Sequence, residues 1–288
     1  GAAGNVVCLD TAKGEVLWQK DLMKLYPGSD IYPSPSPLIE GDVLVLLVGA
    51  KPNATVIGLN KNTGEPVWTA LEEGATASSP IVLTAAGVRQ LIVWTDRSVT
   101  ALGPLTGKIL WAQALNTTQD AAVSTPVTRG SQLLIGGLMM QLAQDKPGAT
   151  VQWPPLEATA RRVFSDTSTA LLGDGYVYTL RNQGKFACVD AKTGEQVWIT
   201  DQVSGYKSGA SVHPTVNGNT VLLYNDHGDL IRANLAPDAY HEISRTHVLD
   251  ATMNFNRYVT WAAPAYAKGN IYVRSDKELV CASLTAEP

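Results

Sequence analysis

Four histidines are the first candidates for metal binding or acid–base catalysis in this 288-residue chain: His213, His227, His241 and His247. None has a second histidine or a cysteine at metal-ligand spacing. The run Asp226-His227-Gly228-Asp229 looks like a cation loop, but it lacks the further carboxylates of a calcium site. It also coincides with an expected hairpin, so a turn is the favoured interpretation. For His213, which precedes Pro214, a hydrogen-bonded structural role is favoured over a catalytic one.

The other nucleophiles and loops give no catalytic pattern. Cys8, Cys188 and Cys281 are too few for a disulfide scaffold and cannot all pair within one chain. The sequence contains no nucleophile elbow, phosphate-binding glycine loop or dinucleotide fingerprint. Hydrolase and nucleotide-dependent chemistry therefore have no support in the sequence.

The composition excludes several further classes of protein. Hydrophobic residues make up 45% and charged residues 17%, so a sizeable core can form and disorder is excluded. The net charge is −4, without the basic footprint that a nucleic-acid partner requires. The longest apolar run, Val43–Ala50, is far shorter than the roughly 20 residues of a membrane helix. We expect no nucleic-acid partner and no transmembrane segment.

A repeat organises the whole chain. The pattern Gly-x-x-x-Trp occurs at Gly14–Trp18, Gly64–Trp68, Gly107–Trp111 and Gly194–Trp198. A small residue lies ten positions before each tryptophan, and the same spacing places Ala143 before Trp153 and Ala233 before Ile243. The small-residue positions are Cys8, Gly58, Ala101, Ala143, Cys188, Ala233 and Cys281. Seven registers at a period near 45 residues indicate a structural repeat.

Each period predicts four short antiparallel strands. In the fifth repeat they are Thr167–Leu172, Tyr176–Leu180, Lys185–Val189 and Glu195–Ile199, separated by turns rich in glycine, asparagine and aspartate. This pattern is typical of a β-propeller blade. We expect an all-β propeller in a single domain, residues 1–288. The repeats lie near 4–21, 32–71, 76–115, 122–156, 164–203, 210–249 and 259–284.

The first and last repeats look incomplete. Two strands are expected in the first, four in each of the next five and three in the last. We therefore expect a fragment of a longer propeller, with the N-terminal outer strands near the C-terminal blade.

The repeated residues have a structural interpretation. We expect the tryptophans to stack adjacent blades, the glycines to occupy the turn between third and fourth strands, and the small residues to leave room beside the neighbouring blade's indole. The three cysteines occupy that small-residue position and are expected to be buried and apolar. The docking residues are Trp18, Trp68, Trp111, Trp153, Trp198, Gly14, Gly64, Gly107 and Gly194.

The run Cys8-x-Asp10-x-x-x-Gly14-x-x-x-Trp18 resembles the tryptophan-docking motif, Ala-x-Asp-x-x-x-Gly-x-x-x-Trp, of the PQQ-like (pyrroloquinoline quinone) propeller repeats. The segments 60–68 and 190–198 fit it best, and the resemblance is closest to the BamB group of outer-membrane assembly proteins. Ala149 replaces the expected glycine in repeat four, and Ala239 and Ile243 replace glycine and tryptophan in repeat six. Looser blade contacts are expected there.

The resemblance implies a non-enzymatic binding or assembly scaffold of the bacterial cell envelope. It implies a periplasmic or otherwise extracytoplasmic location, a protein or peptide partner and no cofactor. The alternative is a PQQ-dependent or other oxidoreductase that uses the central funnel. Quinoproteins of this family hold the cofactor over a tryptophan, often under a vicinal disulfide, and this chain has no adjacent cysteines. Of the tryptophans outside the repeat, Trp94 is expected in the core, and a funnel role for Trp261 stays open.

A ligand site, if there is one, is expected at the funnel mouth, where segments lead into the first strand of each blade. Polar groups that converge on a concave mouth are a general binding-site signal. The alternative is a solvated rim whose polar groups only bind adjacent blades. The candidates are Tyr32, Ser79, Thr125, Arg162, Asp166, Lys207, His213, Arg257 and Trp261.

Overall fold

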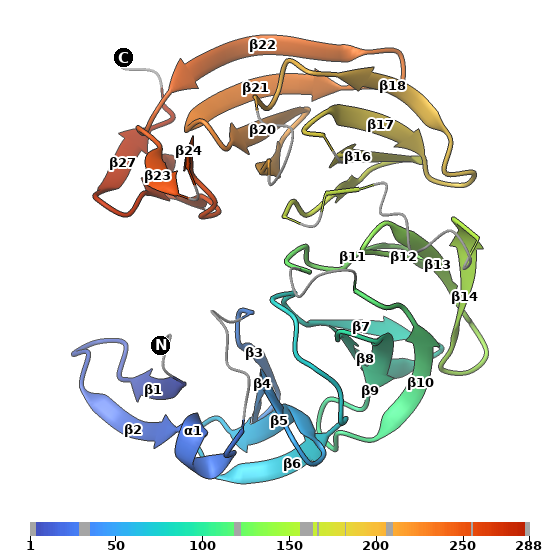
Figure 1. Ribbon diagram of the computed structural model, residues 1–288, viewed down its shortest axis with the longest axis vertical. Helices are drawn as coiled ribbons and strands as arrows, with labels where there is room; N and C mark the ends of the chain where they lie inside the picture. The colour runs from blue at the N-terminus through green and yellow to red at the C-terminus, as the bar shows by residue number, and fades with distance from the viewer. Residues whose placement is uncertain are drawn as a thin grey trace. The chain divides into compact units, whose positions relative to one another are not determined.

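The computed structural model describes residues 4–28, 35–117, 122–155, 164–165, 167–181, 183–205, 210–254 and 256–285 (Figure 1). The chain forms two compact units, Gly1–Arg161 and Arg162–Pro288. Each unit is built from antiparallel sheets whose strands follow one another in chain order. Whether 1–288 forms one propeller domain with the predicted repeat boundaries stays a prediction.

The first unit contains a two-stranded sheet followed by three four-stranded sheets. The two-stranded sheet consists of β1 (Asn5–Leu9) and β2 (Val16–Asp21). The next contains β3 (Leu38–Glu40), β4 (Val43–Ala50), β5 (Ala54–Asn60) and β6 (Pro66–Ala70). The third contains β7 (Ile81–Ala85), β8 (Val88–Trp94), β9 (Ser98–Leu102) and β10 (Ile109–Ala114). The fourth contains β11 (Val127–Arg129), β12 (Gln132–Ile135), β13 (Leu138–Leu142) and β14 (Ala149–Trp153).

A single helical turn, α1 (Leu22–Leu25), follows β2. The carboxylate of Asp21 caps it by accepting hydrogen bonds from the backbone N–H groups of Met23 and Lys24. In the described residues no helix has the length and apolar character needed to cross a bilayer.

The second unit contains two four-stranded sheets and two smaller ones. The first consists of β15 (Leu171–Leu172), β16 (Tyr176–Leu180), β17 (Phe186–Asp190) and β18 (Gln196–Thr200). The next consists of β19 (Val212–Asn217), β20 (Thr220–Asn225), β21 (Asp229–Leu235) and β22 (Tyr240–His247). A hairpin of β23 (Thr252–Asn254) and β24 (Arg257–Val259) precedes a three-stranded sheet of β25 (Ala265–Ala267), β26 (Asn270–Arg274) and β27 (Leu279–Ser283).

The predicted four-strand repeat is present, with two local differences. The strand expected at Thr167–Leu172 is only Leu171–Leu172. The hairpin β23–β24 is additional, because the sequence pattern predicted a loop where Thr252 to Val259 pair. Arg257 therefore lies in a strand rather than in a loop.

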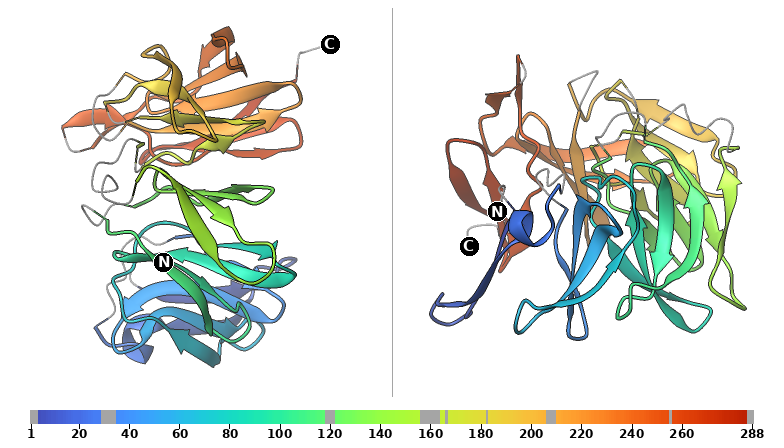
Figure 2. Two further views of the ribbon diagram at one scale, coloured as in Figure 1. Left: turned by 90° about the vertical axis from the view of Figure 1, so that its right-hand side faces the viewer. Right: turned by 60° about the horizontal axis from the view of Figure 1, so that its bottom comes forward.

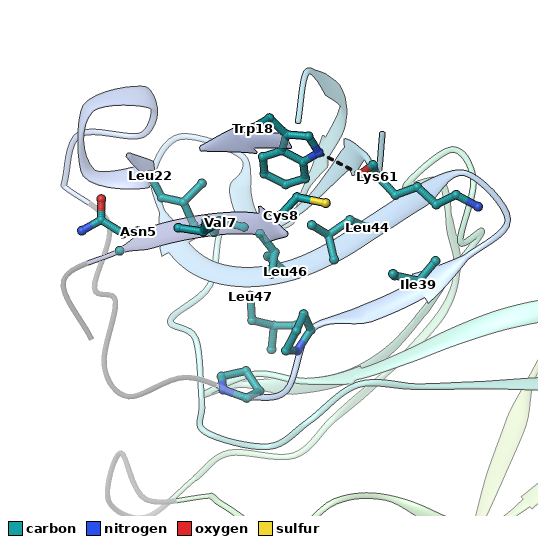
Figure 3. Close-up of a pocket in the computed structure, with 14 residues that line it drawn as sticks. Asn5, Val7, Cys8, Trp18, Leu22, Ile39, Leu44, Leu46, Leu47 and Lys61 are labelled. Carbon is teal, nitrogen blue, oxygen red and sulfur yellow. Dashed lines mark hydrogen bonds between the residues drawn. The ribbon is translucent and has the colours of Figure 1, made fainter. Parts of the chain in front are cut away.

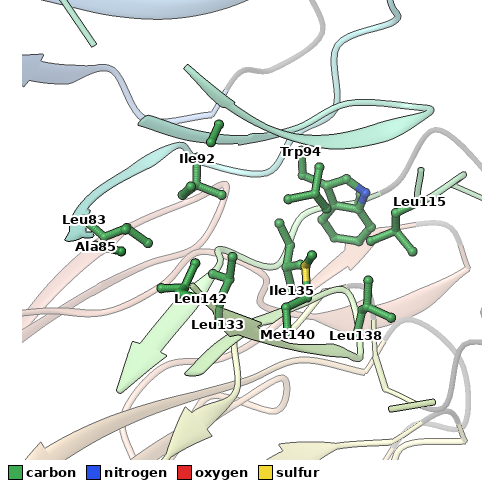
Figure 4. Close-up of a cluster of buried hydrophobic side chains, with 13 residues drawn as sticks. Leu83, Ala85, Ile92, Trp94, Leu115, Leu133, Ile135, Leu138, Met140 and Leu142 are labelled. Atoms are coloured by element: carbon green, nitrogen blue, oxygen red, sulfur yellow. The ribbon is translucent and has the colours of Figure 1, made fainter. Parts of the chain in front are cut away.

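The hydrophobic cores lie between successive sheets rather than within one sheet. In the first unit, Trp94 and Ile92 of β8 pack with Ile135, Leu138 and other buried residues of the next sheet (Figure 4). A second cluster joins β3–β6 to β7–β10, and a third joins the β1–β2 hairpin to β3–β6. The second unit has the same arrangement between β15–β18 and β19–β22, and between β19–β22 and β25–β27. Within each unit the sheets are stacked side by side (Figure 2), which is how blades that are apolar on both faces bury their surface.

The repeated tryptophan docks on the turn glycine of the next sheet. A Cβ atom added to Gly64 would lie 2.7 Å from Cε3 of Trp18, and one added to Gly107 would lie 2.6 Å from Cε3 of Trp68. Both glycines also have positive φ, +71° and +67°, which residues with side chains rarely adopt. Conformation and close approach therefore both require glycine at this turn.

The small residue of the repeat has a different role from the predicted one. Gly58 is the cross-strand partner of Trp68, and a Cβ on Gly58 would lie 2.4 Å from Cε2 of that same indole. Cys188 and Trp198 are paired in the same way. The small residue thus makes room for the tryptophan of its own sheet, not for that of the neighbouring sheet.

The constant spacing of ten residues fails in repeats four and six. Trp153 pairs with Met139 rather than Ala143, because the hairpin between β13 and β14 is longer. In repeat six Ala233 pairs with Glu242, and Ile243 lies at a register shift and is exposed. Ala143 and Ala233, although they lie ten residues before Trp153 and Ile243, are therefore not the cross-strand partners of these residues.

Candidate functional site

Hydroxyl side chains in the segments before the first strands connect neighbouring sheets. In the first unit the backbone N–H of Ser36 donates to Oγ of Ser79 at 3.0 Å, and the hydroxyl of Ser78 donates to the carbonyl of Ser124 at 2.8 Å. In the second unit the N–H of Val212 donates to Oγ of Ser168 at 2.9 Å. These contacts join residues 43 to 46 positions apart, close to the repeat period. For these serines the structure supports the alternative to a ligand site, a rim whose polar groups bind adjacent sheets.

Three predicted site residues lie together in the second unit. His213 is held by Ser211, whose hydroxyl lies 2.9 Å from Nε2. Burial lowers the pKa of His213, and a hydrogen bond to the backbone of Trp261 acts in the opposite direction. The guanidinium carbon of Arg257 lies 5.2 Å from the centroid of the Trp261 ring, a cation–π distance. The imidazole is therefore neutral and hydrogen-bonded near neutral pH, as expected for a structural histidine.

The structure does not test the other predicted site residues as members of one site. Thr125 is half-buried beside Pro126 in the first unit. Tyr32, Arg162, Asp166 and Lys207 lie outside the described residues. The predicted funnel site, taken as a whole, stays a prediction.

Aspartates in the turns between second and third strands hold the linking segments. Asp226 is fully buried; its Oδ2 accepts a hydrogen bond from Oγ of Ser204 at 3.0 Å, and from the N–H of Ser211. Burial raises the pKa of Asp226. Asp96 accepts from the N–H of Gly74 at 2.7 Å, in the corresponding hairpin of the first unit. These residues tether the segment that leads into the sheet, so the run around Asp226 is a structural turn.

Asp276 repeats this arrangement in the last sheet, where it accepts a hydrogen bond from Oγ1 of Thr252 at 3.2 Å. The sequence signal that could have found these residues is an aspartate between second and third strands, recurring in three of the repeats. Of the three, the sequence analysis had considered only Asp226, in a run for which a turn was favoured over a cation loop.

Neither Trp94 nor the cysteines provide the cofactor site of the related quinoproteins. Trp94 is only 1% exposed, and a Cβ on Gly136 would lie 2.4 Å from its Cη2 (Figure 4). This places Trp94 in the core between two sheets, as predicted, and leaves no ring face for a cofactor. The cysteines lie in three different sheets, so a vicinal pair cannot form.

The cysteines differ in exposure. Cys188 is fully buried, as predicted, and burial raises the pKa of its thiol to about 11. Cys8 is half-buried and Cys281 is exposed, so the expectation that all three are buried was wrong. Both lie in sheets that have fewer than four strands among the described residues, where less neighbouring structure covers the small-residue position.

A pocket of about 360 Å³ lies between the β1–β2 hairpin and β3–β6 (Figure 3). Its lining is mostly apolar and includes Val6, Cys8, Trp18 and Leu44. The sequence analysis did not predict it.

Comparisons with known proteins agree with this architecture. Two curated relatives, each named outer membrane protein assembly factor BamB, come from Moranella endobia (strain PCIT) and Yersinia pestis. The first is 27% identical over 206 residues, which are 68% of this chain and 52% of the relative. The second is 25% identical over 208 residues, which are 68% of this chain and 51% of the relative. The chain thus spans about half the length of the curated relatives it matches.

Solved structures confirm the predicted fold class. BamB from Moraxella catarrhalis superposes with a TM-score of 0.68 at 17% identity, over 97% of this chain and 78% of that one. Quinohemoprotein alcohol dehydrogenase from Comamonas testosteroni superposes with a TM-score of 0.59 at 11% identity, over 94% of this chain and 60% of that one. At these identities the likeness concerns the fold alone, and the fold is a β-propeller.

The family profile described as outer membrane protein assembly factor BamB matches residues 1–157 and 141–239. These matches cover most of the chain and contain the docking tryptophans. On this basis the chain belongs to the family of the outer membrane protein assembly factor BamB, a family of PQQ-like β-propeller repeats.

Proposed function

We propose that this chain is a non-enzymatic scaffold in the assembly of outer membrane proteins. It binds protein or peptide partners in the bacterial cell envelope, outside the cytoplasm. The observation that carries the proposal is the match to the BamB family profile over residues 1–157 and 141–239. The two curated relatives have the same name, outer membrane protein assembly factor.

The local chemistry supports a binding role over a catalytic one. Ser78, Ser79 and Ser168 are engaged in hydrogen bonds between sheets, so these hydroxyls are not placed as nucleophiles. His213 is held by Ser211 and by the backbone of Trp261. Side chains in such networks stiffen the stacking of blades, and rigid surfaces suit the recognition of other proteins.

The candidate contact surface is the mouth region of the second unit. Tyr258 of β24 is exposed, and Arg257 beside it lies over the ring of Trp261. Aromatic and arginine side chains are enriched where proteins bind one another. This surface contains Arg257 and Trp261 of the predicted funnel site.

A genetic experiment in the source bacterium tests the proposal. The gene that encodes this chain is deleted, and the amounts of folded outer membrane proteins are measured by heat-modifiable gel migration. We expect a fall that the intact gene restores. The double variant Arg257→Ala, Trp261→Ala should restore less than the control Val197→Ala, which changes an exposed residue of β18. Unchanged outer membrane proteins after deletion would refute the assembly role.

A spectroscopic experiment distinguishes the oxidoreductase alternative. The purified chain is mixed with PQQ and calcium, and the absorbance of bound quinone and dye reduction with alcohols or sugars are followed. The scaffold proposal predicts neither a tight complex nor turnover. Tight binding with dye reduction would replace it by a quinoprotein function.

A further inference from the structure

The hairpin β23–β24, which carries the exposed Tyr258, is anchored at both ends to the turn between β20 and β21 (Figure 1). Before β23, the N–H groups of Val248 and Leu249 donate to the carbonyl of Gly228 at 2.9 and 3.3 Å. After β24, the N–H of Thr260 donates to the carbonyl of Asp226 at 2.9 Å. A two-stranded hairpin is marginally stable by itself, so the order of β23–β24 depends on these anchors.

His247, the last residue of β22, connects this turn to the linker that leads into β23. Its Nδ1 lies 2.9 Å from Oδ1 of Asp229, which ends the turn, and its Nε2 lies 3.0 Å from Oδ1 of Asp250 in the linker. Only a protonated imidazole has an N–H group on both ring nitrogens. The two hydrogen bonds to carboxylates can therefore form together only when His247 carries a positive charge.

The two carboxylates differ in what else holds them. Asp229 also accepts from Arg245 of β22 at 3.3 Å, and it lies 3.4 Å from the side-chain amide of Asn225. The side chain of Asp250 is 93% exposed, and among the described residues only His247 donates to it. Loss of the charge on His247 therefore affects the contact with Asp250 first. The other charged or titratable side chains of the turn, β21 and β22 are Asp226, His227, Arg232, Tyr240, His241 and Glu242.

The protonation of His247 and its two contacts stabilise each other. Hydrogen bonds to Asp229 and Asp250 raise the pKa of His247, and burial acts weakly in the opposite direction. The double contact is therefore complete below the pKa of His247 and is lost as pH rises through it. The neutral ring keeps one N–H for Asp229 and turns a lone pair toward the carboxylate of Asp250, which repels it.

We propose that His247 forms a proton-dependent link that controls the order of the β23–β24 hairpin. The protonated ring holds Asp250 of the linker to Asp229 of the turn, and the neutral ring releases Asp250, so the hairpin opens more often. A partner that contacts Tyr258 then binds more tightly at the lower pH, because an ordered surface loses less conformational entropy on binding. The link rests on the geometry of the linker, whereas its use in controlling a partner rests on the proposed function.

Nuclear magnetic resonance of the purified 288-residue chain tests the protonation step. The chemical shifts of the His247 ring nitrogens are followed between pH 5 and pH 9. We expect both nitrogens to be protonated at low pH and only Nδ1 at high pH. Asp250→Ala should lower the midpoint of this titration, because it removes one of the two hydrogen bonds that favour the charged ring. An equal midpoint in the two proteins would overturn the proposal.

Hydrogen exchange tests whether the link acts on the hairpin. The protection of the backbone amides in β23 and β24 is measured at pH 6 and pH 9 and corrected for the intrinsic exchange rate. We expect about two- to fivefold greater protection at pH 6, the range that exposed charge pairs provide. Asp250→Ala should show the lower protection at both pH values. Asp250→Asn should keep the higher protection at both, because an amide accepts from the charged ring and donates to the neutral one.

A second histidine provides the matched control. Nε2 of His241 lies 3.6 Å from Oδ2 of Asp238, with the same sequence separation as His247 and Asp250. This pair belongs to the connection between β21 and β22 and does not touch the linker into β23. Asp238→Ala should therefore leave the pH dependence of protection in β23 and β24 unchanged.

Two results of the exchange experiment would overturn the proposal. Protection of β23 and β24 that does not change with pH in the parent chain would show that His247 does not hold the hairpin. The same pH dependence in Asp250→Ala would assign the effect to another titrating group, such as Asp226. Neither measurement involves a partner, so loss of the link leaves the assembly role intact, and unchanged outer membrane proteins after gene deletion leave the link intact.

Discussion

Replacing Gly107 by alanine tests the contact between tryptophan and turn glycine most directly. The new methyl group meets two costs: φ is +67° at this residue, and the Cβ would lie 2.6 Å from Cε3 of Trp68. A left-handed conformation costs an alanine roughly 1–2 kcal/mol. Overpacking against a buried side chain adds about 1–3 kcal/mol. We therefore expect Gly107→Ala to lower the free energy of unfolding by about 2–5 kcal/mol.

Gly87 provides a matched control in the same sheet. Its φ is +68°, and an added Cβ would have no neighbour within 4 Å. Gly87→Ala should therefore cost only the conformational part, about 1–2 kcal/mol. The difference between the two variants, about 1–3 kcal/mol, isolates the clash with the indole. Urea unfolding followed by far-UV circular dichroism measures both values on the same scale.

A double-mutant cycle with Trp68→Ala identifies the partner of the clash. In the Trp68→Ala background there is no indole to meet, so Gly107→Ala should cost no more than Gly87→Ala. The coupling free energy should be about 1–3 kcal/mol, the size of the clash itself. Equal costs for the two glycine variants, or a coupling near zero, would show that the tryptophan does not dock on this turn.

Three further predictions concern stability. Trp68→Ala should cost about 3–5 kcal/mol because it empties a site between two sheets; a midpoint shift no larger than that of Val67→Ala would contradict this. Burial raises the folded pKa of Asp226 above its ordinary value. The stability that this residue contributes is therefore present below the ordinary pKa and is lost as pH rises through the folded pKa. Asp226→Asn should therefore lose less stability than the parent between pH 4 and pH 7 in urea titrations, and a parallel pH profile would argue against it. Hydrogen bonds to Asp229 and Asp250 raise the pKa of His247, so His247→Gln should be destabilising at pH 6 and nearly neutral at pH 9, by at most about 1 kcal/mol for an exposed pair; a loss that grows with pH would have the wrong sign.

The repeat and its strands could be predicted because their signals are local. Each repeat places its signals within about ten residues of one another. They are a turn glycine with positive φ, a small residue opposite a tryptophan, and alternating apolar runs. The predicted strand Tyr176–Leu180 has the observed bounds. The ten-residue spacing failed at Trp153 because a longer hairpin changes the strand pairing without changing the composition.

The candidate site was less accessible from sequence. The pattern predicted which segments lead into the first strands, but it could not decide whether their hydroxyls face a ligand or a neighbouring sheet. That choice depends on partners some 43 to 46 residues away, as in the bond from Ser78 to Ser124. The role of Asp226 was hidden for a similar reason, because its partner Ser204 lies 22 residues earlier, in the preceding linker.

The amino-acid sequence by itself determined that this protein is made of stacked four-stranded sheets, because each sheet carries its own turns, strands and docking residues. Only the tertiary structure decided which residues those sheets leave uncovered. Cys188 and Cys8 occupy the same place in the repeat, yet one is buried and the other is half-buried beside a pocket. Burial at these positions comes from the neighbouring strand and sheet, and a local pattern carries no information about whether that neighbour is there.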